Sequence, residues 1–224
     1  MDVQVRLFAS LRERAGTALL ELELADGATV ADALAQLAWL TGGMRAALAV
    51  NREYASESTP LAPGDELALI PPVSGGAESR QSGGPAGPPH VRVSSEPLAA
   101  GRLEALVRDP RAGAVVTFQG VTREVPALQY EAYVEMAVAE IQVIVAAASA
   151  RHGLCAVAVE HRIGEVALSE PSVVIAVSAP HRDEAFAGAR EIIDELKARA
   201  PIWKREQGEW VAGVAVSTPP GPVG

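Results

Sequence analysis

Cationic side chains stand where predicted helices and strands end in the second half of the 224-residue sequence. They are Arg123 after a Val-rich strand, His181 and Arg182 at a helix start, Lys197 in the last turn of that helix, and Lys204 on the extended segment beyond it. Binding sites are concentrated at such ends. A helix start also offers free backbone N–H groups and the positive end of the helix dipole. Together these residues predict a site for an anion, most naturally a phosphate group.

A second chemical feature is the run Pro71-Pro72-Val73-Ser74-Gly75-Gly76. Adjacent glycines carry no Cβ, so they can pass extended through a narrow channel and bring a carbonyl group to a reaction centre. Ubiquitin-like carriers present their C-terminus in this way. Because Gly-Gly pairs are also common in linkers, the flanking residues decide what this pair means.

The residues before the glycine pair predict a β-grasp order of elements, in which a hairpin and a helix are followed by returning strands. Thr29 is a candidate N-cap for the longer helix. The predicted elements are strands at 3–7 and 20–24, a short helix at 9–15 between them, a helix from Val30 to about Leu40, and strands at 48–50 and 66–70.

The residues from 90 onward predict an α+β domain. Pro201 is expected to end its last helix. The very apolar helix at 134–152 is expected either inside a core or in a subunit interface. The predicted elements are strands at 91–93, 114–119, 156–161 and 172–179, helices near Pro97 and at 134–152 and 183–200, and an extended segment at 202–206.

Residues 77–89 are rich in Gly, Pro and Ser and lack apolar periodicity, which predicts a flexible linker. We therefore divide the chain into a first domain at 1–76, the linker, a second domain at 90–217, and a Pro/Gly-rich tail at 218–224.

Composition restricts the partners and the location. The net charge of -9 argues against broad binding to nucleic acid or to an anionic membrane. The sequence begins without a signal-peptide pattern, and its longest apolar stretch is too short to span a bilayer. We therefore expect a soluble cytoplasmic protein.

Other reactive residue types are interpreted as structural. Cys155 is the single cysteine, so neither an intramolecular disulfide nor a cysteine-rich metal site can form, and its apolar neighbours favour burial. His152 and His161 show no spacing typical of metal ligands, and no metal site is predicted. Trp203 is expected in the core. Lys197 taken alone is most simply explained as complementing the helix dipole.

Taken together, four runs resemble the large, catalytic subunit of molybdopterin synthase (MoaE-like). The region at 1–76, with Leu7-Phe8-Ala9 and its closing Gly-Gly run, resembles the small sulfur-carrier subunit of that enzyme (MoaD-like). The resemblance implies a fusion of a ubiquitin-like β-grasp domain with an α/β hammerhead-type domain. The four runs are GAVVTFQGVTR at 113–123, HRIGE at 161–165, APHR at 179–182 and LKARAPIWKRE at 196–206.

This resemblance implies a sulfurtransferase of molybdenum cofactor biosynthesis. The family converts cyclic pyranopterin monophosphate into the molybdopterin dithiolene, with sulfur from a C-terminal Gly thiocarboxylate and no permanently bound cofactor. Gly76 is then the thiocarboxylate residue, and Gly75 occupies the narrow entry channel. Lys197 is the main catalytic lysine, in proton transfer or in transient capture of the carrier's acyl group. The remaining implied roles are assistance at the substrate by Lys204 and binding of phosphate and pterin oxygens by Arg123, His181 and Arg182.

The resemblance also implies partners. An adenylating and sulfurating activating enzyme (MoeB-like) is expected, together with self-association as a dimer or as a heterotetramer of cleaved fragments. Two alternatives stay open. One is a non-catalytic fusion that binds a phosphorylated pterin, and the other is a catalytic domain that uses a separate carrier while the fused one occupies the site. A free thiocarboxylate on the first fragment favours the enzyme, whereas complementation by the second domain plus a free carrier favours the last alternative.

Two features depart from the family pattern. The loop at 124–128 is shorter than usual, which affects how Arg123 is presented. In addition, Gly76 is followed by Ala77, so its carboxyl group is locked in an amide that cannot be adenylated.

We therefore predict proteolysis after Gly76, with the two pieces remaining associated. The Gly83-Gly84 pair is a less favoured position, because no strand leads into it. Intact-mass analysis of active protein from its native host should show a fragment that ends at Gly76. Detection of the full-length chain alone would contradict this prediction.

Overall fold

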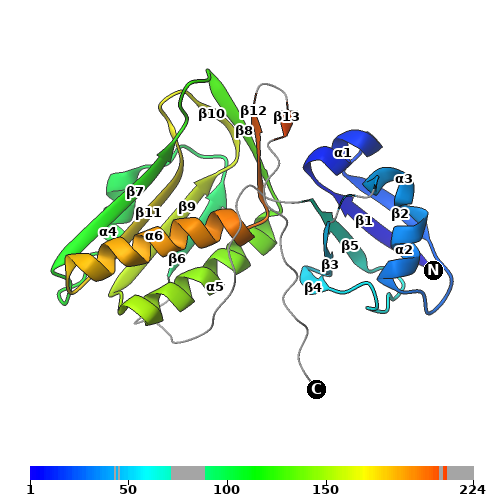
Figure 1. Cartoon of the computed structure of the whole chain (residues 1–224), viewed down its shortest axis with the longest axis horizontal. Coiled ribbons are helices and arrows are strands. Elements are labelled where there is room, and N and C mark those ends of the chain that lie inside the picture. Colours follow the sequence, from blue (N-terminus) through cyan, green and yellow to red (C-terminus); the bar gives the residue numbers. More distant parts are fainter. Residues whose placement is uncertain (43, 45, 72–88, 207–208, 211–224) are drawn as a thin grey trace. The chain divides into compact units, whose positions relative to one another are not determined.

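The computed structural model describes residues 1–71 except 43 and 45, and residues 89–210 except 207 and 208. The described residues fall into two compact units, one at each side of the gap at 72–88 (Figure 1). Gly75, Gly76 and the predicted boundaries at 76 and 217 lie outside the described residues.

The first unit has the predicted β-grasp fold. Its five-stranded sheet has the order β2-β1-β5-β3-β4, in which β1 and β5 are parallel and every other neighbouring pair is antiparallel. The strands are β1 (Asp2–Leu7), β2 (Leu19–Glu23), β3 (Ala47–Val50), β4 (Glu53–Ala55) and β5 (Glu66–Ile70), and the helices are α1 (Ala9–Ala15), α2 (Val30–Gln36) and α3 (Ala38–Thr41).

Local signals set the helix ends of this unit. Gly16 adopts a left-handed conformation with φ of 71° and closes α1. At the start of α2, the Thr29 backbone N–H donates to the Asp32 carboxylate at 2.8 Å. The single helix expected from Val30 to about Leu40 is wrong, because it divides at Leu37. The turn there buries both Leu37 and Leu40 in the core of the unit.

The second unit contains two four-stranded sheets, with the orders β6-β9-β11-β7 and β10-β8-β12-β13. Its strands are β6 (His90–Ser94), β7 (Ala114–Val121), β8 (Ala127–Ala132), β9 (Ala156–Arg162), β10 (Gly164–Ala167), β11 (Pro171–Ala179), β12 (Ile202–Glu206) and β13 (Glu209–Trp210), and its helices are α4 (Ala100–Leu106), α5 (Val134–His152) and α6 (Arg182–Arg199).

Alternating residues of the central strands face different helices. Val157 and Ile175 pack with α5 and α6 in the main core, whereas Ala158 and Ala176 pack with α4 on the other face (Figure 1). Helix α5 therefore has one face in the core, in agreement with the first of its two expected positions. None of the helices within the described residues is long and apolar enough to cross a membrane.

Most predicted elements of this unit are confirmed, with four differences: a shifted helix start and three strands that were not predicted, β8, β10 and β13. The first helix begins at Ala100 and not near Pro97. Strand β10 was not expected, because its four residues carry little alternation of their own and are held by antiparallel pairing with β8. Cys155 and Trp203 are buried, as expected.

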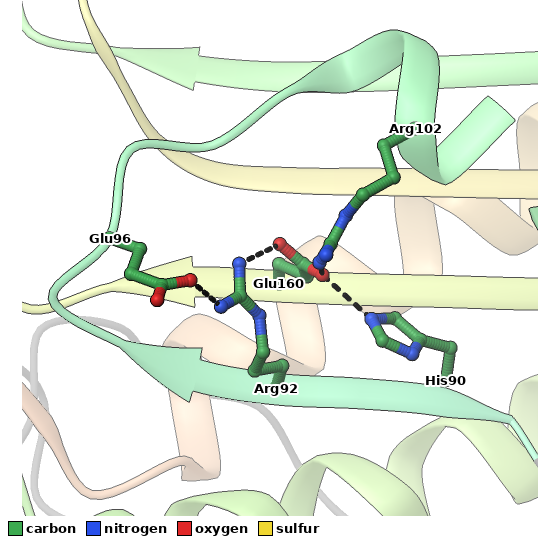
Figure 2. Close-up of polar contacts among 5 residues, drawn as sticks. All are labelled: His90, Arg92, Glu96, Arg102 and Glu160. Atoms are coloured by element: carbon green, nitrogen blue, oxygen red, sulfur yellow. Dashed lines mark hydrogen bonds and ion pairs between the residues drawn. The ribbon is translucent and has the colours of Figure 1, made fainter.

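A buried carboxylate ties β6, α4 and β9 together (Figure 2). The Glu160 side chain on β9 is 1% exposed and accepts hydrogen bonds from His90 Nε2 at 2.7 Å, from Arg92 at 2.8 Å, and from Arg102. Arg92 also contacts Glu96. Burial alone raises the pKa of Glu160, but the hydrogen bonds from Arg92, His90 and Arg102 outweigh it and lower that pKa to about 2.

Replacing Glu160 by Gln should lower the free energy of unfolding by about 3 kcal/mol, because the guanidinium groups then lose their buried counter-charge. The carboxylate's contribution is complete above its ordinary pKa of 4.5 and disappears as the pH falls toward about 2. Urea denaturation near pH 7 measures the difference.

Glu165→Gln is the matched control, since Glu165 lies exposed on the next strand, β10. Its effect should stay within about 0.5 kcal/mol. Equal changes in the free energy of unfolding for Glu160→Gln and Glu165→Gln would contradict the stabilising role of the buried Glu160 carboxylate.

Candidate functional site

A cavity of about 390 Å³ lies in the second unit and gathers side chains from both of its sheets and from α6. Cations line it together with two carboxylates and three neutral polar side chains, over a wall of apolar residues that includes Leu196 and Ile202. The polar and charged lining residues are Arg123, Lys197, Lys204, Glu124, Glu206, Tyr130, His161 and Ser172.

Lys197 and Lys204 are the only lysines of the sequence, and both line this cavity. Lys197 lies in the last turn of α6. Ala200 leaves the helix with φ -66° and ψ 129°, the extended conformation that a following proline enforces, and Pro201 has no N–H with which to continue the helix. The chain then enters β12, where Lys204 lies opposite Tyr130 of β8. Helix and strand thus bring one lysine each to the same cavity.

Ion pairs hold two of the three lining cations. Lys204 Nζ lies 3.2 Å from Glu206 Oε2, and Arg123 lies 3.6 Å from Glu124 on the exposed loop after β7. Glu124 has a positive φ of 65°, a strained conformation for this residue type that is typical of functional loops. Lys197 is exposed and has no ion-pair partner among the described residues. The lining therefore carries a surplus of positive charge, in a protein that is acidic overall.

His181 and Arg182 do not line the cavity. They begin α6, whereas Lys197 lies at its other end, which separates them by about 22 Å along the helix axis. Both are exposed, and Arg182 lies 3.6 Å from Asp183. Of the five predicted cationic residues, Arg123, Lys197 and Lys204 therefore line the cavity of one copy of the chain, and His181 and Arg182 lie outside it. Their predicted contact with the ligand stays a prediction.

His161 belongs to the cavity, although the sequence interpretation treated it as purely structural. Its side chain lies beside Tyr130, with the ring centroids 5.2 Å apart in an edge-on arrangement. Nδ1 lies 2.9 Å from the backbone carbonyl oxygen of Arg162. Burial lowers the pKa of His161 to about 4, against a smaller opposing effect of that hydrogen bond. The available signal in the sequence was its place at the head of the HRIGE run.

His152 pairs with Glu191 at 2.7 Å and takes no part in the cavity. Within the described ranges, no group of three or more His, Cys, Asp or Glu side chains is placed to hold a metal ion. Gly75 and Gly76 lie outside the described residues.

Comparisons with known proteins agree on both units. The family described as MoaE protein matches residues 93–199, and the ThiS family matches residues 5–76. The molybdopterin synthase catalytic subunit of Coccidioides immitis is 40% identical over 136 residues, which cover 54% of this chain and 69% of that protein. The subunit of the same name from Thermoplasma volcanium is 48% identical over 115 residues, which cover 46% of this chain and 84% of that protein.

Solved structures show the same likeness in the second unit. The molybdopterin synthase structure from Staphylococcus aureus aligns with a TM-score of 0.51 and 32% identity, over 54% of this chain and 95% of that chain. Molybdopterin cofactor biosynthesis protein E from Burkholderia multivorans aligns with a TM-score of 0.50 and 35% identity, over 58% of this chain and 91% of that chain.

Because its pKa falls from 6.5 to about 4 on folding, His161 should make stability depend on pH. Below about pH 6.5, His161 binds a proton in the unfolded chain but stays neutral in the folded protein. The free energy of unfolding therefore falls by about 1.4 kcal/mol per pH unit until about pH 4. His161→Asn should lack this loss. Urea denaturation series from about pH 6.5 to about pH 5 should show that the variant loses about 2 kcal/mol less than the wild type. Parallel losses in both proteins would contradict the prediction.

Proposed function

The chain belongs to the molybdopterin synthase catalytic subunit family of molybdenum cofactor biosynthesis, and we propose that it transfers sulfur from a thiocarboxylate at Gly76 to cyclic pyranopterin monophosphate. The observation that carries this proposal is that both lysines of the sequence line one cavity together with Arg123. Their positive charge suits a phosphorylated substrate, and their amines suit proton transfer at the reacting groups. This chemistry favours an enzyme over a fusion that only binds a pterin.

The lining residues differ in what they can contribute. Lys197 is exposed and without an ion pair among the described residues, so its amine is available for proton transfer or for transient capture of the carrier's acyl group. Lys204 is oriented by Glu206 and is suited to holding the substrate. Arg123 lies on an exposed loop, where it can attract the phosphate.

The transfer can be written so that its atoms balance. The thiocarboxylate sulfur forms a bond to a substrate carbon as a carbon–oxygen bond at that carbon breaks, and the oxygen leaves with a proton as water or, where it belongs to the phosphoester, stays on the phosphate. The bond between the transferred sulfur and the acyl carbon of Gly76 is then broken. Water supplies the oxygen that returns Gly76 to a carboxylate, either directly or after the Lys197 amine has held the acyl group. A dithiolene contains two sulfurs, so the carrier must be loaded twice for each product. The thiocarboxylate is the only sulfur source required, and we expect an adenylating, sulfurating enzyme (MoeB-like) to load it once the Gly76–Ala77 bond is cut.

His181 and Arg182 can contact the same substrate only if a second copy of the chain supplies them. Strand β7 forms an edge of its sheet in the described part of the chain, and its outward residues include Val121, which is 50% exposed. This strand begins beside the end of β11, next to His181, and ends at the cavity. Antiparallel pairing of two β7 strands across a twofold axis would therefore bring the start of one α6 to the cavity of the other copy.

Replacing Lys197 by Ala should reduce the conversion of cyclic pyranopterin monophosphate by at least about 100-fold, even with thiocarboxylated carrier supplied, because the amine at the reacting groups is lost.

Arg182→Ala should also impair conversion, since it removes a cation that a second copy contributes. Co-expression of the two variants should restore about one quarter of wild-type turnover, because half of randomly paired dimers are mixed and each mixed dimer has one intact site of two.

Arg190→Ala is the control for the helix, because Arg190 lies exposed on α6 and its ion-pair partner among the described residues is the nearby Asp194. It should leave turnover unchanged. Wild-type turnover in Lys197→Ala would refute the role of that lysine. If both variants are folded and inactive and their co-expression restores no turnover, a site shared between two copies of the chain is refuted.

A further inference from the structure

The cations that line the cavity can only donate hydrogen bonds, so a ligand's own N–H groups depend on the other lining side chains. Lysine and arginine side chains donate only. Of the two lining carboxylates, Glu206 pairs with Lys204 and Glu124 with Arg123. Ser172 uses its hydroxyl proton to donate to the Gly120 carbonyl oxygen at 3.1 Å. Besides the oxygens of these carboxylates and of the Ser172 and Tyr130 hydroxyls, a ligand with N–H groups meets one side-chain nitrogen acceptor in the lining, on His161.

His161 differs from all of these side chains, because its hydrogen bond fixes which nitrogen carries the proton. The Arg162 carbonyl oxygen, 2.9 Å from Nδ1, can only accept a hydrogen bond, so Nδ1 carries the proton. Burial lowers the pKa of the ring to about 4, and the imidazole is therefore neutral near pH 7. Nε2 then carries a lone pair, and it has no hydrogen-bond partner among the described residues.

The ring is also held in place. Its strand, β9, lies between β6 and β11, with His161 opposite Val93 and Val173. The ring packs edge-on against Tyr130, and the residue is only 5% exposed although it lines the cavity. A fixed acceptor loses little conformational entropy when a ligand binds.

We propose that His161 is a positioning residue of this cavity, which accepts a hydrogen bond at Nε2 from an N–H or O–H group of the bound ligand. This role rests on the proposed function, in which the ligand is a phosphorylated pterin. A pterin ring carries amino and ring N–H donors, which the lining cations cannot satisfy. Arg123, Lys197 and Lys204 bind the anionic part, while His161 orients the heterocycle.

Two substitutions separate this role from a structural one. In His161→Asn the side-chain amide can replace Nδ1–H toward the Arg162 carbonyl, but the acceptor at Nε2 is lost. In His161→Gln the longer amide can place its oxygen near the position of Nε2, while the bond to Arg162 is lost. Both are compared with the wild type in the full chain, by titration with cyclic pyranopterin monophosphate and by steady-state kinetics with thiocarboxylated carrier.

His161→Asn should raise Kd and KM about tenfold and change kcat less than about twofold, whereas His161→Gln should stay within about threefold of the wild type in Kd. If Kd and KM are unchanged in His161→Asn, or if substrate binding is weakened equally in both variants, the role of His161 is overturned. The proposed function still stands in that case, provided that the wild type converts the substrate. A wild type that neither binds nor converts the substrate would overturn the proposed function itself, and the His161 role with it.

Nitrogen NMR of the wild type keeps the test valid if a variant fails to fold. The free protein near pH 7 should show His161 protonated at Nδ1 only, and the Nε2 resonance should shift when the substrate is added. A ring protonated at Nε2, or an Nε2 resonance that the substrate leaves unchanged, would overturn the role.

Discussion

The change of direction at Pro201 is the constraint on which the cationic cavity depends. Because proline offers no N–H and forces the preceding residue into an extended conformation, α6 ends and the chain joins a second sheet. Lys197 therefore reaches the cavity from a helix and Lys204 from a strand. A longer helix would have placed them two turns apart along one face, without strand β12 paired to β8 beside the cavity. One covalent feature thus couples the fold of the second unit to its chemistry.

Neighbouring residues on β9 show two ways of burying an ionisable group. Glu160 keeps its charge, because Arg92, Arg102 and His90 surround it on one face of the sheet. His161 lies on the other face of the sheet, where burial lowers its pKa and so favours the neutral ring. The first arrangement holds β6 and α4 to the sheet. The second leaves an uncharged acceptor beside a cluster of cations, which a ligand with both phosphate and N–H groups can use.

The sequence predicted what local signals decide, and it missed what tertiary packing decides. Gly16 and Pro201 end their helices where expected, since left-handed backbone and a missing N–H act within a few residues. The break at Leu37 and the strand β10 depend on burial and on pairing with distant strands, which no local pattern records. In the candidate site, Lys197 and Lys204 could be predicted from the LKARAPIWKRE run at 196–206. The place of His161 in the cavity could not be predicted. Its neutral state arises from burial, and burial follows only from the assembled sheet.

The central claim is that the first domain delivers the sulfur that the cavity of the second domain transfers. The most direct measurement loads heavy-isotope sulfur onto Gly76 of the cleaved protein, adds cyclic pyranopterin monophosphate, and follows both partners by mass spectrometry. The account predicts that the dithiolene product carries the label while the carrier returns as a plain carboxylate at Gly76. Label that stays on the carrier, or a dithiolene that forms without it, would contradict the account.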